Sequence, residues 1–495
     1  MIKNLLLLGA LLAPCTMFAA DYFITPEGAG NKDGSTWGNA MGLTEYYDHM
    51  KFYFGQTKVD DAHTGEQYFF STGKYSFNET IFISSSGVTF KGGYDPTTGE
   101  QANSGRTVFD GNSQARANGA IFVWDHTEET DDNVMNRAVR IQDIDFENFI
   151  TESEWRNDNT NWQSGRPSAI YIQFCGHVEI IGCNFKNNIC RGTGDNAMAG
   201  ALSLNKVNCL VRNCSFTGNE GTDGGAIKVY YNVAGNWTKM SKCTIDRCYF
   251  TGNKTSNRGG AIYGLNLQMI NVINSTMTGN HASQGGAIYK NTSTDYPNIA
   301  NLVSCTLAGN TSTDGEQIYT NGNGVLNVAN SIIVADGDAN AIADESATSG
   351  YTFQGNNLIG KVPGEYISAE SDNISADNTY RTVFGDNTIA ADGTLTPGKY
   401  WSGMAPDAIA AIVTNEAWPF TVDAAVDQLG NARSTSTSNG ALALPHTVTG
   451  GIELVADPEA ENGDEAWYNL QGMRMAERPV ATGIYIHKGR KVLVR

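Results

Sequence analysis

Charge is scarce in this sequence, positive charge in particular, and so is any sustained helical pattern. Only 17% of the 495 residues are charged, and 33 Lys and Arg stand against 52 Asp and Glu, which gives a net charge of −19. This acidic balance argues against nucleic acid and against anionic membrane surfaces as partners. An apolar i, i+3, i+4, i+7 pattern is kept only around residues 408–413, which argues against a helical fold.

Long apolar runs are scarce as well. Beyond residue 20 no stretch is long and apolar enough to span a bilayer, so we expect a protein that is not integral to the membrane. The first residues differ: Lys3 is basic, Leu5–Leu12 is apolar, and Phe18-Ala-Ala supplies small residues for cleavage. Residues 1–20 therefore predict a signal peptide, and with it a secreted or cell-surface protein, at the outer membrane or outside the cell.

What the sequence has in quantity is a two-part repeat. Its first part, Gly-Gly-Ala-Ile, begins at Gly224, Gly259 and Gly285. Its second part ends in Gly-Asn and begins at Cys248, Ser275 and Cys305. Both parts are short, β-prone and bounded by Gly and Asn, which is typical of strands joined by turns.

A repeat of this size predicts a solenoid. One pair of short strands cannot bury its own apolar face, whereas stacked copies form a continuous core. We therefore predict an all-β fold, a single-stranded, right-handed parallel β-helix with an N-terminal cap and a small C-terminal β module. The predicted parts are a signal peptide (1–20), the cap and first coils (21–115), the β-helix (116–446), a polar linker (447–464) and a C-terminal β segment (465–495).

Stacked coils predict columns of equivalent residues about 4.8 Å apart. One inward column would contain Ile121, Ile170, Leu202, Ile227, Ile262, Ile288 and Ile318. A second would contain Phe146, Phe185, Phe216, Phe250, Met277, Leu307 and Ile333. The Gly-Asn pairs would form the turns, because Gly tolerates positive φ and stacked Asn amides can hydrogen-bond from coil to coil.

The cysteines follow the same repeat. Cys209 and Cys214 have the same spacing as Cys243 and Cys248, so the two pairs would fall in two columns of adjacent coils. They could form disulfides or a ladder of buried free thiols, and we favour the ladder because in-register stacking seldom gives disulfide geometry. No CxxC pair is present, so we expect no zinc site.

Three stretches resemble a known family. The opening Tyr22–Ala40, the phrase Ser86–Tyr94 and the Gly-Gly-Ala-Ile repeats resemble secreted right-handed β-helix proteins of the pectate-lyase-like superfamily. Within it the chain is most similar to the non-catalytic members with polymorphic-outer-membrane-protein-like repeats. Val426–Leu444 resembles the phrase that closes such helices. Residues 465–495 resemble the end of the C-terminal sorting domains of secreted Bacteroidetes proteins, or else are a small β-sandwich remnant without an address function.

Two features are candidates for binding. The residue after each inward Ile lies on the opposite face of the strand, in a column of Phe122, Tyr171, Ser203, Lys228, Tyr263, Tyr289 and Tyr319. If that face is exposed, its tyrosines suit sugar rings and protein partners. Alternatively, the face packs under loops or the rings only stiffen the sheet. The second candidate is the insertion 151–165, whose Trp155 and Trp162 belong either to a ligand loop or to a lid packed on the flank.

The resemblance also implies what an active site would need. Lyases of this shape use an Arg or Lys base with carboxylate-bound calcium, and the hydrolases use clustered carboxylates. Asp223 and Arg258 precede the Gly-Gly pairs of successive coils and would pair between coils. They are either a solvated ion pair or, as the catalytic candidates, a base with a calcium-binding carboxylate.

Binding is the predicted function. We expect an adhesin-like protein that recognises a glycan or a host or bacterial surface protein, without a cofactor and without a metal. The alternative is a polysaccharide lyase or glycoside hydrolase that acts on acidic polysaccharide, for which Ca²⁺ would be the cofactor. A structural coat or stalk is a third hypothesis, favoured if Tyr263, Tyr289 and Tyr319 prove buried.

Overall fold

The computed structural model divides into two compact units, Met1–His446 and Thr447–Arg495. The residues that it describes are 20–50, 63–123, 137–152, 168–193, 197–230, 242–267, 269–291, 299–313, 317–322, 324–345, 349–363, 367–400, 403–416, 420, 422–423, 425–434, 437–444, 467–468, 474–475, 483–487 and 490–494.

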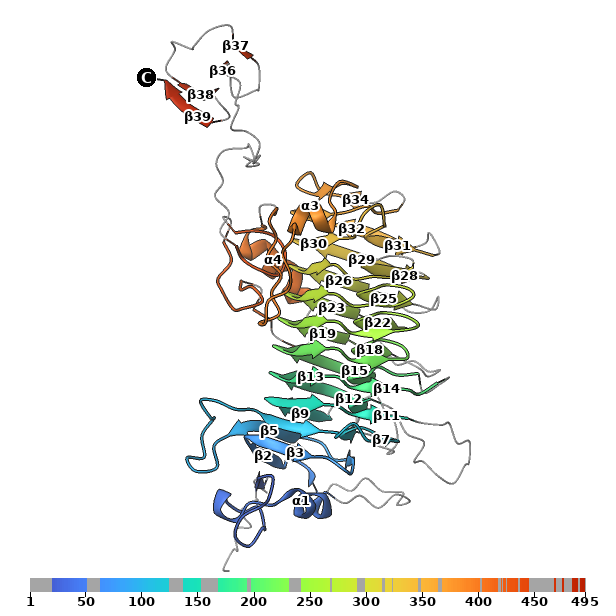
Figure 1. Cartoon of the computed structure of the whole chain (residues 1–495), viewed down its shortest axis with the longest axis vertical. Coiled ribbons are helices and arrows are strands. Elements are labelled where there is room, and N and C mark those ends of the chain that lie inside the picture. Colours follow the sequence, from blue (N-terminus) through green and yellow to red (C-terminus); the bar gives the residue numbers. More distant parts are fainter. Residues whose placement is uncertain are drawn as a thin grey trace, which may run out of the picture. The chain divides into compact units, whose positions relative to one another are not determined.

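The first unit is a stack of coils whose strands pair in parallel from one coil to the next (Figure 1). Among the described residues, these strands form sheets of 19, 11 and 5 strands. The prediction of an all-β parallel β-helix is confirmed, and right-handed is the hand that parallel connections take. The helices described beside it are η1 (Trp37–Asn39), α1 (Leu43–His49), α3 (Tyr380–Phe384) and α4 (Pro406–Glu416).

The largest sheet holds two consecutive strands of most coils. In β12 and β15 the two strands run together without a break. Its strands are β1 (Asp21–Ile24), β2 (Gln67–Ser71), β4 (Ile81–Ile83), β5 (Val88–Tyr94), β8 (Ile121–Val123), β9 (Ala138–Gln142), β12 (Ile170–Ile181), β15 (Leu202–Arg212), β18 (Ile227–Tyr230), β19 (Lys242–Asp246), β22 (Ile262–Leu265), β23 (Met269–Ile273), β25 (Ile288–Asn291), β26 (Ile299–Val303), β28 (Ile318–Asn321), β29 (Gly324–Ala329), β31 (Ile342–Asp344), β32 (Ser349–Phe353) and β34 (Ile367–Ser368).

The other two sheets complete the coils. The second contains β3 (Gly73–Ser76), β6 (Thr107–Asp110), β10 (Ile144–Glu147), β13 (Asn184–Lys186), β16 (Ser215–Thr217), β20 (Tyr249–Thr251), β24 (Thr276–Thr278), β27 (Thr306–Ala308), β30 (Ile332–Val334), β33 (Leu358–Ile359) and β35 (Asn373–Ile374). The third contains β7 (Ala115–Arg116), β11 (Ile150–Thr151), β14 (Ile189–Cys190), β17 (Glu220–Gly221) and β21 (Lys254–Thr255).

The predicted columns are present. Each member of the isoleucine column is the register partner of the next, from Ile121 to Ile318, and the column extends to Ile81 at one end and Ile342 at the other. In the second column the rings of Phe185, Phe216 and Phe250 stack with centroids 4.8 and 4.6 Å apart. These side chains are buried in one continuous core, which is what a stack of otherwise unstable coils requires.

The two residues of each Gly-Asn turn have different roles. Gly218, Gly252, Gly279 and Gly309 take φ of 64° to 65°, the left-handed conformation that favours glycine. The neighbouring asparagines are buried, and their side chains form a ladder in which each amide donates to the next. The bonds run from Asn188 to Asn219, Asn253, Asn280 and Asn310 at 2.9, 2.9, 2.9 and 2.7 Å.

The eight described cysteines are buried free thiols, as the ladder hypothesis predicts. Cys209 and Cys243 are register partners in adjacent coils, with Sγ atoms 2.8 Å apart. In the other column, Cys183 N donates to Cys214 Sγ and Cys248 N donates to Ser275 Oγ. Serine therefore takes the cysteine position in the next coil.

Each coil contains more strands than the repeat predicts. The repeat predicts one strand pair per coil, whereas the structure adds strands such as β19 (Lys242–Asp246) and β23 (Met269–Ile273) and the third sheet. The last parallel strand described is β35, and residues up to His446 belong to the same compact unit. Of the helices, α4 coincides with the weak pattern at 408–413, while α1 and α3 were not predicted.

The described residues between 403 and 444, which we call the closing segment, lie along the flank of the stack. Figure 1 shows α4 beside β23 and β26, and Ile409 packs there against Ile273 and Val303. Gln428 Oε1 accepts a hydrogen bond of 2.6 Å from Thr276 Oγ1, and Ala441 N donates to Thr306 Oγ1 at 2.9 Å. The stretch Val426–Leu444, which was expected to close the β-helix, therefore packs against the side of the coils.

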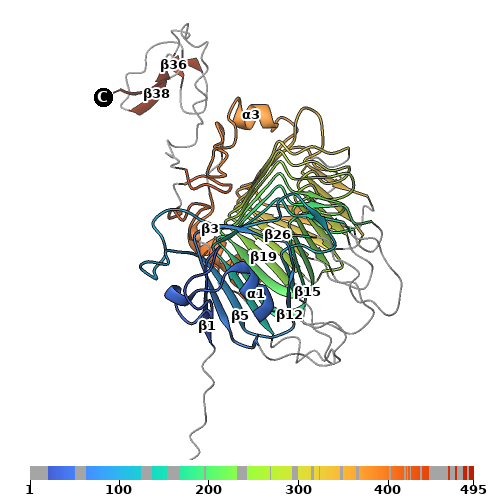
Figure 2. The same cartoon turned by 60° about the horizontal axis from the view of Figure 1, so that its bottom comes forward.

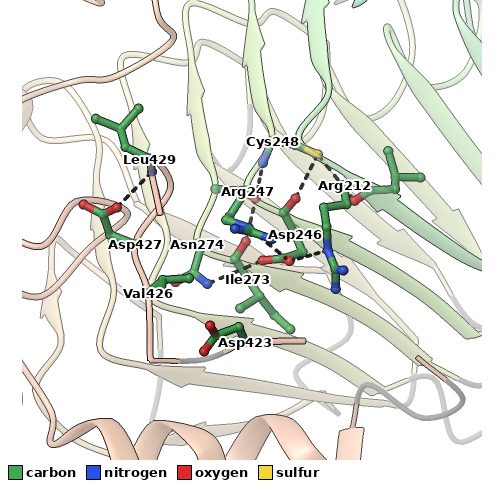
Figure 3. A network of polar contacts seen from close by, with 12 residues as sticks. Arg212, Asp246, Arg247, Cys248, Ile273, Asn274, Asp423, Val426, Asp427 and Leu429 are labelled. Atoms are coloured by element: carbon green, nitrogen blue, oxygen red, sulfur yellow. Dashed lines mark hydrogen bonds and ion pairs between the residues drawn. The ribbon is translucent and has the colours of Figure 1, made fainter. Parts of the chain in front are cut away.

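A buried polar network lies beneath the closing segment (Figure 3). Asp246 is 0% exposed, and its carboxylate accepts hydrogen bonds from Arg212 Nε at 2.9 Å and from Asn274 Nδ2 at 3.4 Å. Asn274 Oδ1 in turn accepts from Nη2 of Arg433, which also donates to the carbonyls of Gly440 and Ala441. Burial raises the pKa of Asp246 despite the lowering effect of Arg247 and Arg212. The network fastens the closing segment to the coils.

The N-terminal cap covers the first coil. β1 pairs with β2 in parallel, and α1 lies across the near end of the stack in Figure 2. Tyr46 of α1 is fully buried, and its ring centroid lies 5.3 Å from those of Tyr68 and Phe70. The helix thus covers apolar rings that the open end of a solenoid would leave in water.

The second unit contains the small β module that the sequence predicts. Its strands β36 (Trp467–Tyr468), β37 (Arg474–Met475), β38 (Gly483–His487) and β39 (Arg490–Val494) pair antiparallel in one sheet. None of the described helices of either unit has the length and apolar character that crossing a membrane requires.

Candidate functional site

Two consecutive coils bring the predicted catalytic pair together with two of the predicted binding residues. Asp223 lies just before β18, which contains Lys228, and Arg258 lies just before β22, which contains Tyr263. Gly224 makes the turn at φ 75°, where an added Cβ would lie 2.4 Å from the carbonyl oxygen of Ile227. Only glycine fits such a turn, and it folds Asp223 back over its own strand.

The contacts in this cluster are ionic and aromatic. Asp223 Oδ2 lies 3.5 Å from Lys228 Nζ, and Asp223 Oδ1 accepts a hydrogen bond of 2.6 Å from Asn257 Nδ2. Lys228 also donates to the carbonyl oxygen of Ala197. Arg258 Nη1 donates to the Tyr263 hydroxyl at 3.2 Å. The predicted partner of Asp223 was Arg258, whereas the ion pair observed is with Lys228.

Burial governs the electrostatics of the cluster. Burial raises the pKa of Asp223, although Lys228 and Arg258 oppose the rise. Burial likewise lowers the pKa of Lys228, against the influence of Asp223. Both residues are less than a tenth exposed, so the pair is a desolvated ion pair and not the solvated one that the sequence suggested. A macromolecule outside can reach the half-buried Arg258 more easily than the pair.

The tyrosine column is aligned as predicted but is not an exposed surface. Tyr263, Tyr289 and Tyr319 are register partners, yet only 1%, 2% and 6% exposed. The rings of Tyr289 and Tyr319 stack at 6°, whereas the ring of Tyr263 is tilted by 45° against that of Tyr289, and both pairs of centroids are 5.4 Å apart. The guanidinium of Arg258 lies 5.8 Å from the Tyr263 centroid and 5.7 Å from that of Tyr289. The exposure that a binding face requires is therefore absent, and the burial of these tyrosines is the outcome that favours the structural coat or stalk hypothesis over binding by this face.

The remaining predicted binding residues divide into two groups. Tyr171 is 1% exposed and packs against Phe122, Met198 and Tyr230, so it too is a packing residue. Lys228 is 6% exposed and lies over the rings of Tyr230 and Tyr263, with Nζ 5.0 and 5.4 Å from their centroids. Trp155 and Trp162 lie outside the described residues, and their ligand-loop role stays a prediction.

Chemically, the cluster offers a buried acid next to a buried base and a more accessible guanidinium. Such a pair could exchange a proton with a substrate only if that substrate reached the cluster, whereas Arg258 can meet an anionic group at the surface. The arrangement therefore suits recognition of an anionic group. It does not resemble the clustered calcium-binding carboxylates that the lyase hypothesis requires.

A second polar cluster was missed. His49, His63 and Glu66 lie within 4.8 Å of one another at the N-terminal cap. Glu66 is 17 positions from His49 and 3 from His63. His49 ends a helix and Glu66 directly precedes a strand, and no local sequence pattern predicts that two such residues lie close together. Only the identity of the residues, two histidines close to a glutamate, could have drawn attention to it.

The comparisons agree with the repeat. Residues 247–265 and 274–291 match the Chlamydia polymorphic membrane protein repeat. No curated protein has a sequence that matches the chain. The chain thus contains repeats like those of polymorphic membrane proteins, in two consecutive coils of the β-helix.

Three solved structures can be named among those that are similar. The pectate lyase Pel9A is 14% identical, with 86% of this chain and 96% of the lyase covered and a TM-score of 0.36. A glycoside hydrolase is 10% identical, with 72% and 96% covered and a TM-score of 0.41. XylC, in complex with xylose, is 10% identical, with 86% and 98% covered and a TM-score of 0.36. At these values the similarity carries no argument about activity.

Proposed function

We propose that the chain is an exported β-helix protein, displayed at the cell surface, that acts by binding in the manner of an adhesin. The observation that supports this best is the repeat match, because residues 247–265 and 274–291 are similar to the repeat of a membrane protein. The signal peptide proposed for residues 1–20 would export the chain. Residues 465–495 would serve as a sorting or anchoring segment.

The burial of the tyrosine column narrows where a partner could bind. Arg258 is half-buried, and its guanidinium covers the edge of the column. A planar guanidinium suits the carboxylate or sulfate of an acidic glycan, or an acidic side chain of a surface protein. We propose Arg258 and the loop with Trp155 and Trp162 as the contact residues.

A glycan array tests this proposal. The mature full-length protein should bind a defined subset of glycans, acidic ones foremost, and Arg258→Ala and the double variant Trp155→Ala/Trp162→Ala should each lower the affinity at least tenfold. Lys254→Ala is the matched control, since Lys254 pairs with Glu220 on the surface with 58% and 44% of the two side chains exposed. Absence of binding both to the array and to intact host or bacterial cells would refute the adhesin proposal.

The enzyme hypothesis remains the second candidate, and a specific observation favours it: the buried pair of Asp223 and Lys228, with opposed pKa shifts, beside Arg258. A lyase would release unsaturated sugar, which absorbs in the near ultraviolet, from pectate, alginate or glycosaminoglycan with Ca²⁺. Activity on one of these substrates, lost in Arg258→Ala and in Lys228→Met but kept in Lys254→Ala, would replace binding with catalysis as the function.

A further inference from the structure

The N-terminal cap brings two histidines and a glutamate together. His49 is the last residue of α1, His63 follows in the loop, and Glu66 directly precedes β2. One ligand atom from each side chain lies within 4.8 Å of the other two. The cluster is remote in sequence from the tyrosine column, and neither the packing of the coils nor the proposed binding function uses it.

Both imidazoles face the same carboxylate oxygen. His49 Nε2 lies 3.3 Å from Glu66 Oε2, and His63 Nδ1 lies 2.8 Å from it. In a tetrahedral zinc site, bonds of about 2.0–2.1 Å hold neighbouring ligand atoms roughly 3.3 Å apart. The first contact has this spacing already, and the second needs to open by only a few tenths of an ångström.

The surroundings hold these groups in place. The Tyr68 hydroxyl donates to the same Glu66 oxygen, and Tyr68 is fully buried. Carboxylates that bind metals are commonly oriented by such a hydrogen bond. The ring of Tyr22 lies 4.4 Å from that of His49, centroid to centroid. The side chains of His49, His63 and Glu66 are 20%, 18% and 10% exposed, so an ion can enter from solvent and still meet a largely buried carboxylate.

We propose that His49, His63 and Glu66 bind one zinc ion. Two imidazoles and a carboxylate are ligands that zinc prefers, and a water molecule would complete the tetrahedron. The ion links the end of α1 to the start of β2 and so fastens the cap to the first coil. The missing CxxC pair excluded only sites built on cysteine, which is why the sequence predicted no metal.

Zinc binding by the full-length, tag-free protein tests the proposal, since a polyhistidine tag would itself bind the ion. Titration against a chromogenic zinc chelator should give one tight site per chain, and zinc should raise the melting temperature. His49→Asn and His63→Asn should abolish the site and the thermal shift. Tyr68→Phe should keep the site but weaken it by about 10–100-fold, the usual effect of losing a supporting hydrogen bond.

His281→Asn is the matched control, because His281 is an exposed histidine whose Nδ1 contacts Thr311 Oγ1 in a later coil. It should bind zinc as the wild type does. X-ray absorption of the zinc-loaded protein should show nitrogen and oxygen neighbours only. The proposal is overturned if the wild type binds no tight equivalent, if His49→Asn/His63→Asn binds as the wild type does, or if sulfur appears among the neighbours.

Discussion

At the scale of single residues, strand alternation sends one lysine into the interior. Lys290 is two positions after the inward Ile288, so it points to the same side, and it is 1% exposed. Its register partner in the preceding coil is Gly264, which has no side chain to compete for the space. Its ammonium has no hydrogen-bond partner among the described residues. Burial lowers the pKa of Lys290 from 10.5 to about 8.

This shift predicts a pH dependence of stability. Because the folded-state pKa lies below the unfolded value, the charged form is the costly one. The cost is fully present below about pH 8, falls as pH rises, and vanishes above pH 10.5. Lys290→Met should therefore stabilise the protein at pH 7, by an amount of the order of 3 kcal/mol, and hardly at pH 10.5. Urea unfolding at both pH values measures this, and equal effects at both would contradict it.

A second prediction concerns the tyrosine column. Tyr289→Ala should destabilise the protein by about 3–5 kcal/mol, because it removes a large buried ring from the middle of a stack. Tyr289→Phe keeps the stacking and loses only the 3.3 Å hydrogen bond from Asn321 Nδ2, so it should cost about 1 kcal/mol or less. Thermal unfolding distinguishes the two. If Tyr289→Ala left stability unchanged and reduced binding instead, the column would be a ligand surface after all.

At the scale of elements, the closing segment depends on one arginine. Arg433 is 5% exposed, and its Nη2 bonds to Asn274, Gly440 and Ala441. Arg433→Ala should leave Asn274 Oδ1 and the Gly440 carbonyl without this donor, at about 1–3 kcal/mol each, whereas the Ala441 carbonyl keeps the backbone N–H of Gln428. The loss should loosen the segment. Limited proteolysis with mass spectrometry should show new cleavages within 403–444.

The control for this prediction is Arg381→Ala, since Arg381 is an exposed residue of α3. It should be digested as the wild type is. New cleavages spread over the coils of the Arg433 variant, and not confined to the closing segment, would mean that the arginine supports the stack as a whole.

At the scale of the whole molecule, the burial of the cysteines predicts that they are free thiols and not disulfides. The cysteines from Cys175 to Cys305 are buried free thiols, and burial raises the pKa of Cys209 well above its ordinary value. Thiolates are the reactive form, so the native protein should react with a thiol reagent very slowly. The unfolded mature protein, which lacks Cys15 of the proposed signal peptide, should react with eight equivalents. An intact mass two hydrogens lighter, with Cys209 and Cys243 linked, would show that the closest pair is oxidised instead.

The fold was predictable because its information is local and repeated. Ile227, Ile262 and Ile288 occupy the same place in successive copies, and parallel stacking leaves them no other arrangement than a column. The asparagine ladder could be predicted for the same reason, from a turn that recurs with the same two residues.

The features that could not be predicted depend on contacts that the repeat pattern does not indicate. Alternation places Tyr263 opposite Ile262 but does not reveal that stacked neighbours and Arg258 cover its ring. The hydrogen bonds of Gln428 to Thr276 and of Arg433 to Asn274 join positions 152 and 159 apart. The cluster of His49 and Glu66 depends on how α1 lies over the first coil. Such contacts follow from the assembled fold, and no stretch of sequence contains them.

One further property follows from the asparagine ladder. Its steps span 31, 34, 27 and 30 residues, yet every amide meets its neighbour at nearly the same distance. Differences in length are therefore absorbed outside the sheets. Unequal recombination that removed the stretch between Asn219 and Asn253 would bring the amide of Asn219 to Asn280, an equivalent partner. The ladder itself would therefore stay continuous if the chain lost or gained a whole coil.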